Sequence, residues 1–265
     1  MNLRLRFMCL KNLTRHFSPH SWHPSSSALS ALSILSLLTL SPASQAFAGT
    51  NNDPKTCRVS DQACIREALK QYAQSDKQTL TYSGARQAMF QKIDIFLNEK
   101  GTRVVKSVYS PDVFEVGHGI PKNGVNTEHT WPQTFLKKSG RFEEARADIY
   151  HLFPSEVQIN GIRGSLPFAE CGHESNVEGA VCENSQRGFE PPEEHKGIVA
   201  RAMFYVSVIY SLSIDGQQEK TLRHWSATHP VSNSEVLRAD KIKEVQGNRN
   251  PFIDHPEWIE MVSDF

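Results

Sequence analysis

Residues 126–133 read Asn-Thr-Glu-His-Thr-Trp-Pro-Gln, so that a carboxylate stands directly beside an imidazole. Consecutive residues of a regular strand point to opposite faces, and Glu128 and His129 can therefore flank one reaction centre only at a strand end or bend. A second polar stretch occupies residues 148–168. Within it, residues 156–161 predict a short helix from which Asn160 projects. The two stretches together predict a strand and a helix that carry reactive side chains.

The residue types in these stretches could bind a hard cation and accept a proton. Mg²⁺ prefers oxygen ligands and keeps several of its waters, so one carboxylate and one amide oxygen are a sufficient contribution from the protein. Glu128 and Asn160 would fit that demand. An imidazole such as His129, with an ordinary pKa of about 6.5, can take a proton from water near neutral pH. Taken singly, each residue also has a purely structural interpretation, as an exposed Glu-His pair or a turn Asn.

A third polar block, residues 246–254, reads Gln-Gly-Asn-Arg-Asn-Pro-Phe-Ile-Asp. Two Asn and an Arg between Gly and Pro are too dense for an ordinary connector. They either satisfy buried backbone groups or line a cleft, and both interpretations stay open. On the second interpretation, Asn248 and Arg249 are candidate substrate-binding residues.

Periodicity outside these blocks predicts a fold made mostly of helices. Apolar residues recur at helical spacing in residues 62–73 and 82–98, and residues 196–212, apolar almost all round, predict a buried central helix. Ser232 with Glu235 is a capping box that opens a helix to about Gln246, which Gly247 terminates. Short strands at 103–109 and 113–116 flank a turn, and a loop follows at 117–125. Because strands are few and do not alternate with helices, we expect a single irregular α+β domain.

The first 48 residues differ from the rest of the 265-residue chain. They hold Arg4, Arg6, Lys11 and Arg15 but no acid, then an apolar run at 28–40 and the sequence Ala46-Phe47-Ala48. This order predicts a secretory signal peptide at 1–48 and an exported domain at 49–265. A membrane anchor is disfavoured because spanning a bilayer takes about 20 apolar residues. Without the segment, Lys+Arg falls from 29 to 29 − 4 = 25 against 29 acids, a net charge of −4.

Composition excludes a disordered or collagen-like chain, because hydrophobic residues make up 38% and charged residues 22%. The zero net charge of the full chain does not exclude a nucleic-acid partner, because the net charge does not show where the basic residues lie. Affinity for phosphates depends on where Lys and Arg lie. Lys137, Lys138, Arg141 and Arg146 gather shortly after His129, so the sequence is compatible with a nucleic-acid partner contacted through its phosphates.

Four cysteines, Cys57, Cys64, Cys171 and Cys182, remain after the predicted signal peptide. An even number in an exported chain indicates disulfides. Three connectivities are possible, and we favour the local one, Cys57–Cys64 with Cys171–Cys182, because each pair brackets a short stretch. A zinc site is disfavoured because no C-x₂-C spacing occurs.

Four stretches in this order resemble the bacterial endonuclease I family, exported nucleases of the His-Me finger (ββα-metal) type. They are residues 80–86, 126–133, 148–168 and 245–252. The resemblance implies a hairpin followed by a helix. His129 would lie on or near the first strand, the second strand would lie around residues 149–152, and Asn160 would lie on the helix.

The resemblance also implies a site at the matching positions. Glu128 and Asn160 would ligate one Mg²⁺, for which other divalent cations can substitute, and His129 would be the general base of a phosphodiester hydrolysis that leaves 5′-phosphate ends. Arg141 and Arg146 are the candidates for the family's catalytic arginine, and Arg163 and His151 are further substrate contacts. The family commonly has Asp-Leu-His at residues 148–150. Tyr150 replaces that His here, so any role of the His does not carry over.

The function implied is a sequence-nonspecific endonuclease acting on DNA, with RNA as a second candidate substrate. We expect a monomer that is periplasmic or extracellular and unattached to a membrane after signal cleavage. One alternative is an exported, non-catalytic nucleic-acid-binding protein that keeps the fold. A Ser-His-Asp hydrolase is disfavoured because no G-x-S-x-G elbow occurs.

Overall fold

A computed structural model describes residues 52–171, 180–181 and 187–265 of the chain. The predicted signal peptide lies outside these residues and stays a prediction. Within the described ranges, no helix combines the length and the apolar character that crossing a membrane requires.

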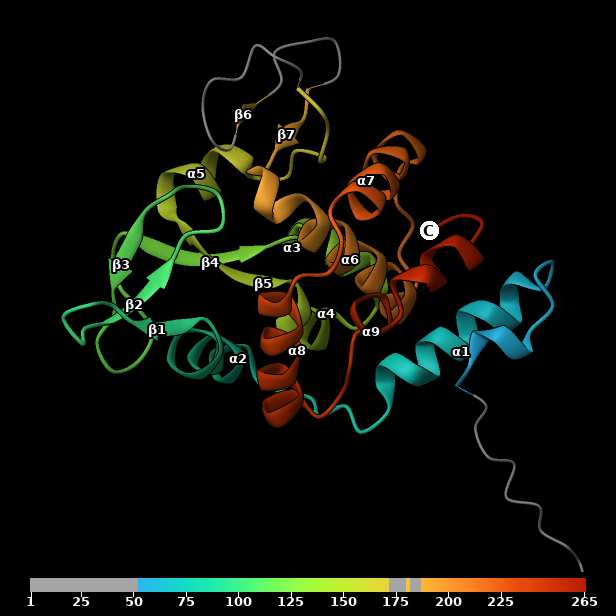
Figure 1. Ribbon diagram of the computed structural model, residues 1–265, viewed down its shortest axis with the longest axis horizontal. Coiled ribbons are helices and arrows are strands. Elements are labelled where there is room, and N and C mark those ends of the chain that lie inside the picture. The colour runs from blue at the N-terminus through green and yellow to red at the C-terminus, as the bar shows by residue number, and fades with distance from the viewer. Residues whose placement is uncertain (1–51, 172–179, 182–186) are drawn as a thin grey trace, which may run out of the picture. The chain divides into compact units, whose positions relative to one another are not determined.

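The centre of the fold is helix α6, Glu193–Tyr210, and nearly all of its residues from His195 onward are buried. It packs against α1 (Gln62–Gln74), α7 (Gly216–Thr228) and α9 (Pro251–Asp254), which surround it in Figure 1. A helix that is apolar all round must be covered on all sides. The predicted buried central helix is therefore confirmed, with bounds shifted by two or three residues.

Helix α8, Asn233–Gln246, begins and ends where its capping signals predict. The Ser232 hydroxyl accepts a hydrogen bond from the Glu235 amide at 3.2 Å. Gly247 follows the helix with φ +88°, and a Cβ at this position would collide with the carbonyl of Asp76. Both the backbone conformation and the close approach require glycine here.

The predicted helix over 82–98 is only partly correct. Residues Tyr82–Ala88 form α2 and Met89–Ile93 one further helical turn, η2, but Ile95–Leu97 form strand β1. This strand pairs with β2 (Arg103–Lys106), which pairs in turn with β3 (Val113–Glu115). Pairing with residues further along the chain therefore prevails over the local helical periodicity, and β2 ends before the predicted residue 109.

Two strands and a helix that follow one another position the polar residues singled out above. Strand β4, Val125–His129, pairs antiparallel with β5, Leu152–Glu156, and α5, Val157–Arg163, follows at once. The Glu156 carboxylate caps α5 by accepting hydrogen bonds from the amides of residues 158 and 159. The second strand was predicted around 149–152. Residues 149–151 instead form a 3₁₀ turn, η4, capped by Asp148, and the strand begins at Leu152.

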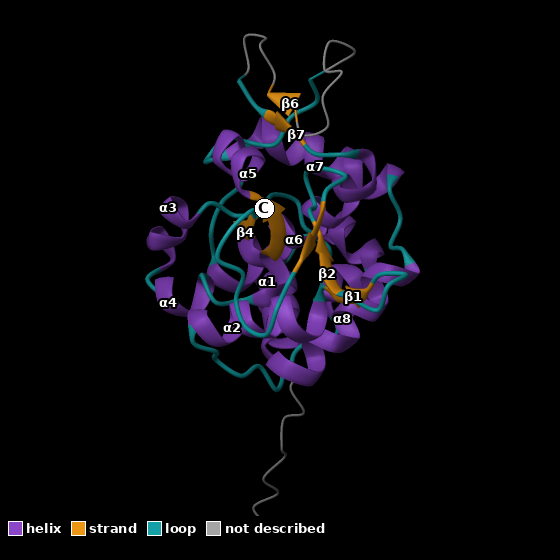
Figure 2. Ribbon diagram, turned by 90° about the vertical axis from the view of Figure 1, so that its left-hand side faces the viewer, coloured by secondary structure: helices purple, strands orange, loops and turns teal. Residues whose placement is uncertain are grey.

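The remaining elements are short. Helices α3 (Gln133–Leu136) and α4 (Phe142–Ala145), with the turn η3 (Lys137–Ser139), fill the connection from β4 to β5, and β6 (Ala180–Val181) pairs with β7 (Phe189–Glu190). Turns η1 (Pro54–Thr56) and η5 (Pro256–Met261) lie near the two ends of the described chain. Figure 2 shows helices with a few short strands. Mixed helices and small antiparallel sheets are what the α+β prediction requires.

Candidate active site

The carboxylate of Glu128 is buried on the face of β4 that α5 covers, with 2% of the residue exposed. Its Oε1 accepts a hydrogen bond from the Tyr109 hydroxyl at 2.9 Å and lies 3.3 Å from Nη1 of Arg163. Burial raises the pKa of Glu128 above its usual range, although Arg163 and Tyr109 both favour the charged form. Tyr109 was not anticipated, because no motif links it to a residue 19 positions away.

Asn160 lies on α5 at the same interface. Its Nδ2 donates a hydrogen bond to Oδ1 of Asn126 at 2.6 Å. Asn126 precedes Glu128 by two residues on β4 and so shares its face, and Arg163 follows Asn160 by one helical turn. Glu128 and Asn160 therefore both belong to the contact between β4 and α5, although no hydrogen bond between them is found in the described part of the chain.

His129, the last residue of β4, points to the opposite face. Its ring packs against the rings of Tyr82 and His151, with centroids 5.4 and 5.6 Å away. Its Nε2 lies 3.0 Å from the carbonyl oxygen of Arg146. A carbonyl oxygen only accepts, so Nε2 carries the proton and Nδ1 carries the lone pair. Burial, followed by the nearby His151, lowers the pKa of His129 to about 3, so the ring is neutral at pH 7.

His151 does not fit the predicted contact with substrate. It is fully buried, and its Nε2 donates a hydrogen bond to the carbonyl of Ala145 at 2.7 Å. Its ring lies edge-on to His129 and fixes the position of that imidazole from behind. The neighbouring Tyr150 points into the core, where its hydroxyl donates to the carbonyl of Asn248.

The three arginines predicted to contact phosphate differ in how close they lie to Glu128 and His129 and in what they bind. Arg141 binds the Glu144 carboxylate and the carbonyl of Ile209, away from Glu128 and His129. Arg163 is 1% exposed and donates to the carbonyls of His129 and Thr130, so it fixes the end of β4 and does not fit a phosphate contact. Arg146 adjoins the site, because its guanidinium lies 5.0 Å from the ring of Tyr82, which packs on His129.

Arg86 is a basic residue of the site that the sequence did not single out. Its Nε donates to the Thr127 hydroxyl at 3.1 Å, and its guanidinium lies 5.5 Å from the Tyr82 ring. It forms no ion pair with an acid in the described ranges. Arg86 and Arg146 thus flank the aromatic ring that supports His129. The available signal was the stretch 80–86, which ends in this residue.

The third polar block is structural. Asn248 is 1% exposed and donates to the Ala73 carbonyl and the Tyr205 hydroxyl, while Arg249 pairs with Asp254 and Asp240. Substrate-binding roles for Asn248 and Arg249 do not fit these positions. Of the two interpretations of residues 246–254, the structure favours the one in which they satisfy buried polar groups.

The Cys57–Cys64 disulfide is formed as predicted, and it joins η1 to the start of α1. The second predicted pair includes Cys182, which lies outside the described residues, so that pairing stays a prediction.

The donor set at the β4–α5 contact suits a hard cation. Nowhere in residues 52–171 or 187–265 do three or more His, Cys, Asp or Glu side chains form a metal-binding group. Mg²⁺ needs no such group, because it binds through one or two carboxylates and retains water. Glu128 supplies a carboxylate and Asn160 an amide oxygen, and both residue types match the preference of this ion.

Comparison with known proteins identifies a family and several relatives. The family model for endonuclease I matches residues 60–257. The chain is 36% identical over 160 residues to an extracellular ribonuclease of Bacillus amyloliquefaciens, with 52% of this chain and 53% of that protein covered. It is 32% identical over 121 residues to an extracellular deoxyribonuclease of Aeromonas hydrophila, covering 44% and 53% respectively. It is 27% identical over 169 residues to an endonuclease-1 of Buchnera aphidicola, covering 54% and 69%.

The chain therefore spans about half the length of the first curated relatives it matches. The family model covers well over half of the chain and includes β4, β5 and α5. The chain belongs to the endonuclease I family.

Proposed function

We propose that this protein is a Mg²⁺-dependent, sequence-nonspecific endonuclease that hydrolyses phosphodiester bonds of DNA, and of RNA as a second substrate. The observation that carries the proposal is the hydrogen bonding of the His129 ring. Its Nε2 donates a hydrogen bond to the Arg146 carbonyl, and its Nδ1 forms no hydrogen bond with any described residue. A fixed imidazole with a free lone pair meets the geometric requirement of a general base.

In the proposed reaction, Nδ1 of His129 accepts a proton from the attacking water. Glu128 and Asn160 would hold the cation, and Tyr109 and Arg163 orient the Glu128 carboxylate. The chemistry supplied by a bound Mg²⁺ is stabilisation of negative charge on the phosphate and on the departing 3′ oxygen. The product ends would be 5′-phosphates. Glu128 and His129 leave β4 on opposite faces but stand next to each other at its carboxyl end, and the proposal puts the scissile phosphate there.

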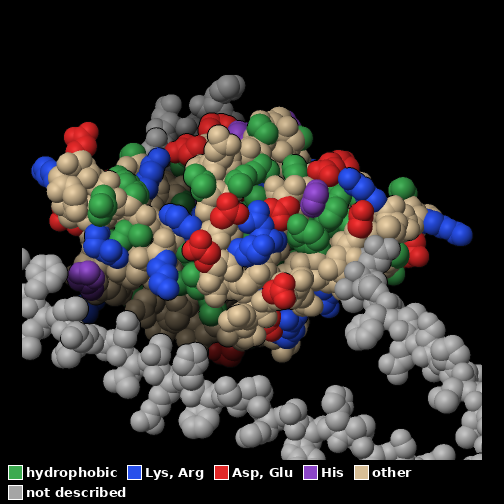
Figure 3. Space-filling view, turned by 60° about the horizontal axis from the view of Figure 1, so that its bottom comes forward, with side chains coloured by type: hydrophobic (Ala, Val, Ile, Leu, Met, Phe, Trp, Pro, Cys, Tyr) green, Lys and Arg blue, Asp and Glu red, His purple; other side chains and the backbone are tan. Residues whose placement is uncertain are grey.

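The positive charge at the site is local. Figure 3 shows basic and acidic side chains interspersed over the described part of one face. Arg86 and Arg146 both contact the Tyr82 ring next to His129, and Arg146 also pairs with the exposed carboxylate of Glu143. We propose that these two guanidinium groups bind the phosphates on either side of the scissile bond. Contacts limited to phosphates give affinity without reading the base sequence.

The proposed place of action is outside the cytoplasm, in the periplasm or the medium, and the proposed form is a monomer. Support comes from the N-terminal segment, from the Cys57–Cys64 disulfide, which persists in oxidising compartments, and from relatives named extracellular or periplasmic.

The test is incubation of the purified protein with plasmid DNA and with RNA, with and without EDTA. We expect degradation that EDTA abolishes and added Mg²⁺ restores. Asn160→Ala and Glu128→Gln should each shift the Mg²⁺ titration to higher concentration. Binding of nucleic acid without cleavage under any metal condition would contradict the proposal and support the non-catalytic alternative.

A further inference from the structure

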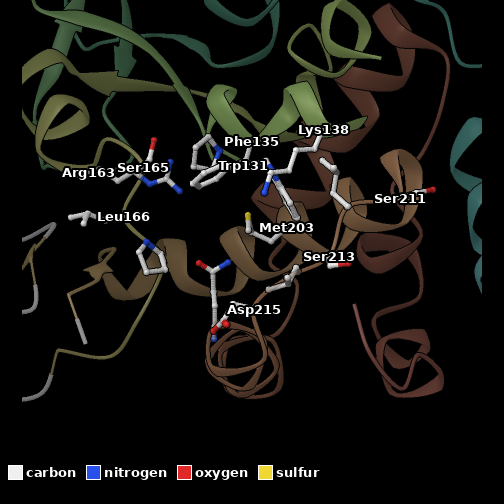
Figure 4. Close-up of a pocket in the computed structure, with 15 residues that line it drawn as sticks. Trp131, Phe135, Lys138, Arg163, Ser165, Leu166, Met203, Ser211, Ser213 and Asp215 are labelled. Carbon is white, nitrogen blue, oxygen red and sulfur yellow. Dashed lines mark hydrogen bonds between the residues drawn. The ribbon is translucent and has the colours of Figure 1, made fainter. Parts of the chain in front are cut away.

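A cavity of about 570 Å³ opens beside the site just described. One wall comes from the segment after β4, with Trp131, Pro132 and Phe135, and the opposite wall from Met203 of α6 and the chain after it (Figure 4). Arg163 closes one end of the cavity. Its volume lies within the range of pockets that hold small ligands, about 300–1,000 Å³.

Arg163 separates the cavity from the proposed reaction centre. Its Nη1 lies 3.3 Å from Glu128 and donates to the carbonyl of His129, while the same side chain lines the cavity. Trp131 follows His129 by two residues along the chain. A nucleic-acid strand with a phosphate at Glu128 and His129 would therefore carry its next nucleotide past the cavity mouth.

The lining suits a flat, amphipathic ligand attached to a phosphate. Aromatic and aliphatic side chains supply the walls, and the polar groups of Ser165, Ser213 and Gln218 stand among them. Nε1 of Trp131 and Nε of Arg163, two donors of lining residues, are buried behind the cavity surface and have no hydrogen-bond partner in the described part of the chain.

The mouth carries an aromatic ring and a cation. Phe135 is 43% exposed, and the ammonium group of Lys138 lies 5.7 Å from its ring. Lys138 forms no ion pair in the described ranges and is exposed. An exposed ring beside an unpaired cation is the combination that single-stranded nucleic-acid sites use, with the ring stacking a base and the cation contacting the backbone.

We propose that this cavity is a subsite for one unstacked nucleobase of the substrate strand, next to the scissile phosphate. The subsite rests on the proposed nuclease function. The base stacks on Phe135 and lies over Met203, and Lys138 contacts the adjoining phosphate. Because a duplex keeps its bases stacked, filling the cavity costs least for a strand that is already single. The protein therefore binds single strands more tightly than duplexes of the same sequence.

The test measures binding by fluorescence anisotropy in EDTA, where cleavage does not interfere. The probes are a short single-stranded oligonucleotide, its duplex, and a strand of equal length whose central nucleotides are abasic. The variants are Phe135→Ala and Lys138→Gln, with Phe96→Ala on β1 as the matched control, because Phe96 is 46% exposed and lies outside the cavity lining.

Phe135→Ala should weaken binding of the base-bearing single strand about ten-fold or more, the usual effect of removing one stacking ring, and should leave the abasic strand unaffected. Lys138→Gln should weaken both strands by the same factor, and Phe96→Ala neither. Equal loss on both strands for Phe135→Ala, or no loss, overturns the subsite. Plasmid degradation by the unaltered protein is assayed in parallel, so a failed subsite with intact degradation is distinguished from failure of the nuclease function.

Discussion

Replacing Asp148 by Asn should lower the free energy of unfolding by about 3 kcal/mol. The carboxylate is 1% exposed and accepts hydrogen bonds from the Tyr205 and Tyr210 hydroxyls at 2.9 and 2.8 Å. The ammonium group of Lys77 lies 3.2 Å away, and the Lys77 side chain is only 6% exposed. Removing one charge of a buried pair costs about 3–5 kcal/mol. Lys77 keeps Glu144 at 2.9 Å, so we expect the lower end of that range.

The assay is urea and thermal unfolding of the two proteins. For a chain of this size, 1 kcal/mol shifts Tm by about 2–4 °C, so Asp148→Asn should lower Tm by about 6–12 °C. The matched control is Asp240→Asn, whose carboxylate side chain is 56% exposed in its pair with Arg249. Removing an exposed ion pair should change stability by less than about 1 kcal/mol.

The difference should also depend on pH. Burial alone would raise the pKa of Asp148, but Lys77, His151 and the surrounding donors hold it below its usual value. A carboxyl group whose pKa is lower in the folded state stabilises fully above its unfolded pKa of about 3.9, and this contribution disappears as the pH falls through the folded value. The gap between the two proteins should therefore be constant near neutral pH and shrink below about pH 4. Equal stabilities at pH 7, or a gap that widens in acid, would refute the reasoning.

Three further predictions concern the site and its support. Tyr109→Phe removes a hydrogen bond to a buried carboxylate, which is worth about 1.5–3 kcal/mol. Half-maximal activity of this variant should therefore need about ten-fold more Mg²⁺. An unchanged Mg²⁺ titration would count against the role of Tyr109 in positioning Glu128. Arg146→Gln should reduce turnover about ten-fold through the lost phosphate contact, whereas Arg141→Gln should alter stability only. Equal turnover of the two variants would contradict a phosphate contact specific to Arg146. Replacing Cys57 and Cys64 together by Ser should lower the unfolding free energy by about 2–3 kcal/mol, and an unchanged urea midpoint would contradict that stabilisation.

The sequence predicted correctly the helices whose ends or burial depend on neighbouring residues in the chain. Helix α8 begins at a Ser cap and ends at a Gly that no other residue could replace, and α6 shows its burial in its own composition. Strand β1 could not be predicted, because Ile95–Leu97 continues the apolar spacing of the preceding helix and becomes a strand only through pairing with β2. Strand β5 was placed too early, since the turn formed by residues 149–151 depends on the Asp148 cap and on partners distant in sequence.

The site divides in the same way. Adjacent residues on a strand must point to opposite faces, and Glu128 and His129 do so, with His129 at the strand end. What contacts them could not be predicted, because Tyr109, Tyr82 and Arg86 reach β4 only through the tertiary fold. The polar density of residues 246–254 was equally compatible with a cleft and with a buried network. Only the burial of Asn248 and its bonds to Ala73 and Tyr205 distinguish the two.

The central claim is that His129 is the general base, and the most direct measurement is the rate of plasmid cleavage by His129→Ala in saturating Mg²⁺. The account predicts that cleavage is lost while DNA binding and folding persist, and that added imidazole partly restores the rate by replacing the missing base. His224→Ala, which removes an exposed histidine on α7, should cleave at the unaltered rate. Cleavage by His129→Ala at the rate of the unaltered protein would contradict the account.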